Sequence, residues 1–356
     1  MKASRPDLDI STVIPYALGG IALVLLPVNA GAAVDRQNTL DAPLNYFLHS
    51  FGPASRPTMH LGWIMTGLLS AITFLVALLL ITAIWRKRSP ADQRAIGQER
   101  GGLRWVYIGT GLSTCILAGL VVYSLLVLNA VAKPSQAPIL TLNITGYDWW
   151  WKIEYASANT AQRFITANEI HIPVGEPVLL QLNSADVIHA FWIPVLAGKT
   201  QMIPGLTNQK WIQADVPGIY LGQCAQFCGA GHAHMGLEVV AESRDDFQQW
   251  QEHQRQAVHA PTALAADARE GYEVFMDRCA GCHTVRGTEA RGDHGPDLTH
   301  LRSRRRIAAG RLINTPEHVM NWIMHAQRYK PGSRMPSITL PEAEVSALAA
   351  FLSTLD

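Results

Sequence analysis

The sequence predicts a multidomain protein: a two-helix transmembrane hairpin, then an all-β domain, then an all-α domain. Two apolar runs, 61–85 and 105–131, are each long enough to cross a bilayer, which needs about 20 apolar residues. After them, short β-rich runs alternate with glycine and proline turns, and the C-terminal part has helical periodicity. The length of 356 residues also predicts two or three domains.

The N-terminus has the pattern of a signal peptide. Lys2 and Arg5 precede an apolar stretch, 14–26, and small residues follow up to position 33. This order predicts a signal peptide over 1–33 that is cleaved from the mature protein. A retained segment is the alternative. The hairpin then occupies 34–132.

The loop between the two apolar runs is basic, which sets the orientation of the hairpin. Its basic residues are Arg86, Lys87, Arg88, Arg94, Arg100 and Arg104. Because basic loops remain on the cytoplasmic side, both ends of the hairpin should lie outside. Two buried helices of a soluble protein would be amphipathic, and these uncharged runs are not. We therefore expect two spans in a bacterial plasma (inner) membrane, with the later domains on the periplasmic or outer face.

Residues 138–245 are predicted to form the all-β domain. The runs 139–145, 170–173 and 178–182 are rich in β-forming residues, and turns are predicted at 175–177 and 216–218. Many short strands joined by such turns are typical of a sandwich or barrel.

Sulfur and imidazole side chains cluster within this β domain. Cys224 and Cys228 are four apart, His232 follows four later, and Met235 three after that. These soft ligands select copper or zinc over hard cations. One blue copper takes one Cys, two His and a Met, and a structural zinc site has no place for Met. The second thiol is therefore surplus unless two thiolates bridge two ions, and His189 is the best candidate for the second imidazole.

The segment 186–235 resembles the binuclear copper centre, CuA, of cytochrome c oxidase subunit II. That family has a His-containing loop followed by Cys-x-x-x-Cys-x-x-x-His-x-x-Met. The resemblance implies a cupredoxin-like Greek-key fold and two copper ions. The implied ligands are His189, Cys224, Cys228, His232, Met235 and the backbone carbonyl of Gln226.

Two substitutions leave a magnesium site in doubt. The family usually has a Glu where this chain has Gln226, and the carboxylate of that Glu reaches a magnesium ion. Gln201 likewise replaces an Asp of the family motif. The copper ligand at Gln226 is a backbone carbonyl, so it survives the change.

An aromatic cluster, 147–155, resembles the family's aromatic stretch beside CuA. Trp149 aligns with the Trp through which electrons enter from cytochrome c. The resemblance therefore implies an electron-accepting role for Trp149. Core and membrane-interface packing is the alternative for Trp149, and it is what we expect of the other aromatic residues.

The C-terminal domain carries the attachment signal of a c-type haem, Cys-x-x-Cys-His, at Cys279, Cys282 and His283. The two thiols would bind the haem covalently as thioethers, and His283 would be an axial iron ligand. Met335 precedes Pro336 in a Gly/Pro loop and is the best candidate for the other axial ligand. His/Met ligation raises the haem potential.

Helical patterns surround these ligands and predict an all-α domain over 268–356. The attachment signal followed by Met335-Pro336 resembles the arrangement of a class I cytochrome c, which implies that fold. An apolar stripe runs from Val345 to Leu355, and 339–342 resembles a capping box. A linker is expected over 246–267. The basic residues Arg302, Arg304, Arg305 and Arg306 predict a solvated face, with docking to an acidic partner or to lipid headgroups as the alternative.

From about Leu61 onward the chain resembles the fused subunit II of a caa3-type oxidase. This implies transfer from an external cytochrome c or other donor, through haem c and CuA, to haem a in subunit I, where oxygen is reduced to water. Oxidase subunits I and III are the implied partners. The alternatives are a CuA-containing nitric oxide reductase subunit and a free-standing membrane-anchored electron carrier. The net charge of +1 gives no case for nucleic acid.

Overall fold

A computed structural model describes residues 48–86, 101–157, 159, 162–258 and 264–356. The predicted signal peptide, 1–33, and the basic loop over 87–100 lie outside the described residues. All described residues belong to one compact unit, Ala42–Asp356.

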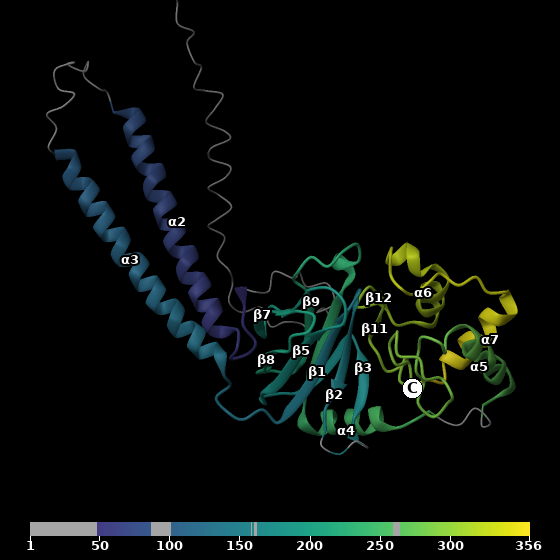
Figure 1. The fold of residues 1–356 in the computed structure, drawn as a ribbon. Helices are drawn as coiled ribbons and strands as arrows, with labels where there is room; N and C mark the ends of the chain where they lie inside the picture. Colours follow the sequence, from purple (N-terminus) through teal and green to yellow (C-terminus); the bar gives the residue numbers. More distant parts are fainter. Residues whose placement is uncertain (1–47, 87–100, 158, 160–161, 259–263) are drawn as a thin grey trace, which may run out of the picture. The chain divides into compact units, whose positions relative to one another are not determined.

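Two long apolar helices form the hairpin, α2 (Arg56–Trp85) and α3 (Gly101–Ala132) (Figure 1). They begin a few residues before the predicted spans at 61 and 105 and are long and apolar enough to cross a membrane. Their large apolar side chains face outward, as in Phe74, which is 67% exposed. Such rows of exposed apolar side chains suit a lipid solvent.

Hydrogen bonds tie both ends of the hairpin to the β domain. Ser55, directly before α2, donates from Oγ to Val195 O (2.6 Å). Near the end of α3, Val131 O accepts from Trp211 Nε1 (2.9 Å). The helices are therefore anchored to the β domain at the turn after β6 (His189–Ile193) and at β8 (Asn208–Ile212).

The β domain is a sandwich of two five-stranded sheets, with strand orders β3-β2-β1-β5-β8 and β4-β10-β9-β6-β7. Its strands are β1 (Leu140–Tyr147), β2 (Trp150–Tyr155), β3 (Phe164–Ala167), β4 (Glu169–Pro173), β5 (Val178–Ser184), β6 (His189–Ile193), β7 (Ala197–Met202), β8 (Asn208–Ile212), β9 (Gly218–Cys224) and β10 (Gly236–Glu242). Alternation explains the core: in β1, Leu142 and Ile144 are buried while their neighbours are less so.

Helix α4 (Arg244–Arg255) fills the first half of the segment expected as a linker. Ser243 caps it by accepting a hydrogen bond from Asp246 N (3.1 Å). Phe247 joins the core of the sandwich, and Trp250 stacks on His171 of β4 (4.0 Å between centroids). This helix therefore belongs to the packing of the β domain.

The C-terminal domain contains α5 (Ala266–Arg278), α6 (Pro316–Tyr329) and α7 (Glu342–Leu352), with a short hairpin of β11 (Arg306–Ile307) and β12 (Leu312–Ile313). The hairpin is an addition to the predicted all-α domain. Gly271 permits close packing of α5 on α7, because a Cβ there would lie 1.9 Å from Ala347 O.

The predicted capping box at 339–342 is wrong, because Pro341 is the N-cap of α7 and makes no side-chain cap. The predicted apolar stripe is confirmed by the burial of Leu348, Leu352 and Leu355. The multidomain prediction as a whole is also confirmed: a hairpin of two apolar helices, a cupredoxin-like sandwich and a helical domain.

Candidate copper and haem sites

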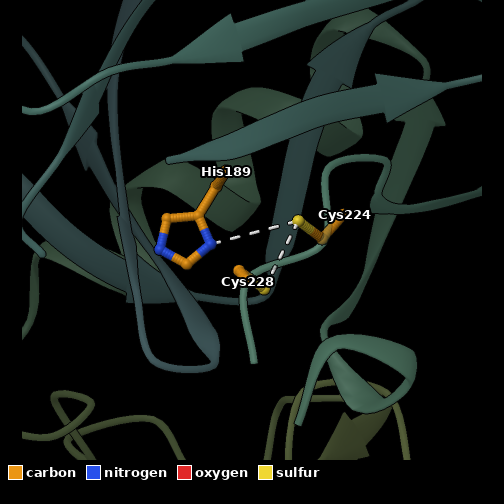
Figure 2. Close-up of side chains that lie close together, drawn as sticks. All are labelled: His189, Cys224 and Cys228. Carbon is orange, nitrogen blue, oxygen red and sulfur yellow. Dashed lines mark hydrogen bonds between the residues drawn. The ribbon is translucent and has the colours of Figure 1, made fainter. Parts of the chain in front are cut away.

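Two buried thiols form the centre of the first site. Cys224 ends β9, Cys228 lies in the following loop, and their Sγ atoms are 3.8 Å apart (Figure 2). A disulfide needs about 2.05 Å, so both remain free thiols. Pairing of β9 with β10 fixes the two ends of the ligand loop, and Cys224 N donates to Met235 O (3.0 Å).

One imidazole stands beside each thiol. His189 Nδ1 lies 4.0 Å from Cys224 Sγ, and His232 Nδ1 lies 3.6 Å from Cys228 Sγ. His189 begins strand β6, which pairs with β9 so that Phe191 faces Cys224. Figure 2 shows the His189 ring directed toward the two thiols.

The remaining predicted donors lie at the same place. Met235 Sδ is 4.0 Å from Cys228 Sγ, and Gln226 O is 3.2 Å from Cys224 Sγ. The structure therefore brings all six predicted donor groups together, the two cysteine sulfurs and four others around them. No predicted ligand of this site is left out.

The number of ligand groups distinguishes a site for one metal ion from a site for two. Two bonds of about 2.3 Å to one tetrahedral ion would place their sulfurs about 3.8 Å apart, so the sulfur–sulfur distance alone fits one ion or two. A single zinc or blue copper uses about four ligands. Six converging donors exceed that number, and two bridged ions would use all of them.

Asp186 fixes the orientation of His189. Its Oδ1 lies 2.8 Å from His189 Nε2, which therefore carries the ring proton and leaves Nδ1 to face the thiols. Carboxylates commonly orient metal-binding histidines in this way. The sequence gives no signal for this role of Asp186, because an Asp three residues before a His has no distinctive pattern.

The two thiols titrate as a pair when no metal is bound. The hydrogen bond from Cys228 lowers the pKa of Cys224 to about 3, and the same interaction raises the pKa of Cys228. The pair thus holds one proton between two sulfurs. Binding a metal to both thiolates would release that proton.

Trp149 joins the thiol loop to a second site. Its Nε1 donates to Cys228 O (2.8 Å), and the same residue lines a cavity that the C-terminal domain forms for the most part. The other aromatic residues of the cluster pack as expected: Trp151 is buried edge-on against Phe191, and Trp150 stacks on Tyr147.

The cavity brings together the four predicted haem-binding residues, Cys279, Cys282, His283 and Met335. Both cysteines are free thiols. Apolar side chains such as Phe275, Leu301 and Ile323 form much of the wall, which suits a large apolar ring.

The surroundings of His283 suit the predicted role of an iron ligand. Its Nδ1 donates a hydrogen bond to Pro296 O (2.8 Å). The other ring nitrogen, Nε2, therefore keeps the lone pair that can bind a metal. Burial lowers the pKa of His283, favouring the neutral imidazole that binds a metal. Gly295 is required here, because a Cβ would lie 2.6 Å from His283 Cε1. The donors and the wall therefore fit a haem.

Lys330 is a cavity residue that sequence reasoning missed. It is 4% exposed, lines the cavity, and donates from Nζ to Trp149 O. Burial lowers the pKa of Lys330 to about 7. A lysine next to a Pro-Gly turn is normally expected to be exposed to solvent, so the sequence gives no signal that Lys330 is buried.

Comparison with known proteins agrees with both sites. A family model of the periplasmic domain of cytochrome c oxidase subunit II matches residues 158–243, and a model of cytochrome c matches 268–356. The first implies copper in the β domain and the second implies haem in the C-terminal domain.

Relatives match over most of their length. The chain is 32% identical to cytochrome c oxidase subunit 2 of Alkalihalophilus pseudofirmus over 304 residues, 83% of this chain and 86% of that protein. It is 28% identical to the same subunit of Bacillus sp. (strain PS3) over 289 residues, 76% of this chain and 80% of that protein. The solved periplasmic domain of subunit II from Bradyrhizobium japonicum is 29% identical, with a TM-score of 0.32 over 34% of this chain and 97% of its own. This chain belongs to the cytochrome c oxidase subunit II family, and it carries a cytochrome c domain after its copper-binding domain.

Proposed function

We propose that this chain accepts electrons for a caa3-type haem–copper oxidase. When bound, haem c and binuclear CuA would supply the redox chemistry that takes electrons from an external cytochrome c or other donor to haem a of subunit I, where oxygen is reduced to water. The observation that carries this proposal is the position of Trp149, which lines the haem cavity and bonds to the copper loop.

The thiol loop would hold two copper ions. Cys224 and Cys228 would both bind them, with His189 beside the first thiol and His232 beside the second. Met235 and the Gln226 carbonyl would complete the set. Because β6 and β9 carry His189 and Cys224, and the paired strands β9 and β10 fix both ends of the loop that carries the other donors, the ligand positions should change little between oxidation states.

The C-terminal cavity would hold one covalent haem. Cys279 and Cys282 would hold the haem through thioethers, and His283 and Met335 would bind its iron. Support comes from the convergence of all four residues on one apolar cavity.

The indole of Trp149 would accept electrons on the cavity side and deliver them at Cys228. A hydrogen bond of 2.8 Å and burial of the ring hold this path in one geometry. Lys330 fixes the same residue from the other side through the Trp149 carbonyl.

The placement in the cell follows from the hairpin. We propose two spans in a bacterial inner membrane, the copper and haem domains on its outer face, and oxidase subunits I and III as partners. Gln201 and Gln226 offer neutral amides, whereas magnesium prefers carboxylates. These two positions therefore supply no charged magnesium ligand.

The test is to purify the native complex through a tag on this chain and to measure oxygen consumption with reduced cytochrome c. We expect subunits I and III in the complex and consumption that slows when Trp149→Phe removes the hydrogen bond to Cys228. The matched control is Trp150→Phe, which changes a neighbouring cavity residue. A complex that consumes nitric oxide but not oxygen, or a chain with no haem-containing partner, would contradict the proposal.

A further inference from the structure

The basic run of the haem domain is not the solvated face expected from the sequence. Arg304 is only 9% exposed. Arg306 Nε lies 3.0 Å from one carboxylate oxygen of Glu238, and Arg305 Nε lies 3.4 Å from the other. Two cations of the haem domain therefore converge on a single acid of the copper domain.

The copper domain contains two buried acidic residues, Glu169 and Glu238, whose charges need nearby cations. Glu238 on β10 and Glu169 on β4 are register partners in adjacent parallel strands, and both are buried, at 2% and 6% exposure. Like charges directly opposite each other destabilise a sheet. Buried charges also need partners to compensate for lost hydration. Within its own domain the pair meets only one cationic side chain among the described contacts, His171 beside Glu169.

The haem domain supplies backbone contacts to the same two strands. Glu169 Oε2 accepts a hydrogen bond from Arg305 N (3.0 Å). Gly236, the residue after the ligand Met235, donates from its N–H to Ala309 O (3.0 Å). A Cβ at Gly236 would lie 3.1 Å from that oxygen, so the two backbones approach closely.

We propose that the Glu169–Glu238 pair is a docking site for the chain's own Arg305–Arg306 segment, and that it holds the haem domain against the copper domain. The acidic partner of the basic run is then internal rather than another protein or a lipid surface. This inference does not depend on which cofactors are bound.

Docking of this kind has a clear use. It keeps the cavity that contains His283 and Met335 beside Trp149, so that transfer between the two sites needs no diffusional encounter. The Arg306–Glu238 pair is largely buried, with side chains 19% and 3% exposed, and such pairs are screened by salt much less than exposed ones. The docked arrangement should therefore persist at ionic strengths that abolish surface steering.

Hydrogen–deuterium exchange of the full chain in detergent tests the proposal, because two amides report the docking directly. Arg305 N and Gly236 N both donate across the boundary. We expect Glu238→Gln and Arg306→Gln each to accelerate their exchange at least tenfold, which corresponds to about 1.4 kcal/mol. Exchange in the two domain cores should remain unchanged. The double variant should show less than the sum of the two single effects.

The matched control is Arg302→Gln. Arg302 belongs to the same basic run, and its backbone N–H bonds within the haem domain, to Leu355 O (2.8 Å). Unchanged exchange at both reporter amides in Arg306→Gln would overturn the proposal, and so would equal acceleration in Arg302→Gln. If Glu238→Gln loosens the sandwich core itself, Arg306→Gln decides, since it removes the same ion pair from the other domain.

Discussion

Gly231→Ala should displace Trp149 and damage the connection between the two sites. A Cβ at Gly231 would lie 2.3 Å from Trp149 Cδ2 and 2.4 Å from Cε3. Since carbon atoms pack at about 3.5 Å, the ring would have to retreat by about 1.2 Å from its present 2.3 Å. The ring is buried, so it cannot move freely into solvent.

The cost can be worked from two contributions. Overpacking of a filled site costs about 1–3 kcal/mol. Stretching the bond from Trp149 Nε1 to Cys228 O leaves a buried carbonyl without its donor, which costs about 1–3 kcal/mol more. We expect a total loss of about 2–4 kcal/mol, because the two contributions overlap in part.

Thermal unfolding of the full chain in detergent, followed by circular dichroism, measures this loss. Gly198→Ala is the matched control, because the nearest atom to its added Cβ is Lys210 Nζ at 3.7 Å, an ordinary contact. Equal melting temperatures for Gly231→Ala and Gly198→Ala would refute the packing argument.

Three further predictions follow from side chains that support the sites. Asp186→Asn should weaken copper binding about 10–100-fold in competition with a chelator, because the carboxylate no longer orients the ligand imidazole; unchanged affinity would contradict this role. Met335→Ala should lower the haem midpoint potential in a redox titration, since the thioether ligand raises it; an unchanged potential would rule out Met335 as the ligand. His171→Gln should cost about 3–5 kcal/mol at pH 6, because it leaves Glu169 and Glu242 without their shared cation. Burial lowers the pKa of His171, but bonds to the two carboxylates outweigh it and raise that pKa above 6.5. The stabilisation from His171 should therefore be complete below pH 6.5 and be lost as the pH rises through the raised pKa; wild-type melting that does not fall in this range would contradict it.

The metal ligands were predictable because their chemistry is concentrated in short motifs. Cys224, Cys228, His232 and Met235 lie on one loop between two strands, so their spacing alone brings them together. His189 was harder to assign, since its position depends on the pairing of β6 with β9. It was the best candidate because it follows a β-rich run, and the resemblance to a known family supported that assignment.

The contacts between domains were not predictable from local pattern. Glu169 and Glu238 resemble ordinary polar residues of strands, and only the pairing of β4 with β10 shows that they face each other. Strand β4 is buried along its whole length, so it lacks the alternation that would reveal its faces. The same reason explains the error over the basic run, because nothing near Arg306 in the sequence shows which acid it meets.

The most direct test of the account is the copper content per haem of the purified full chain, measured together with its copper electron spin resonance. Six donor groups, the two sulfurs included, predict two coppers per haem, with one unpaired spin shared by both nuclei. One copper per haem with a single-nucleus signal, or zinc in its place, would contradict the binuclear site.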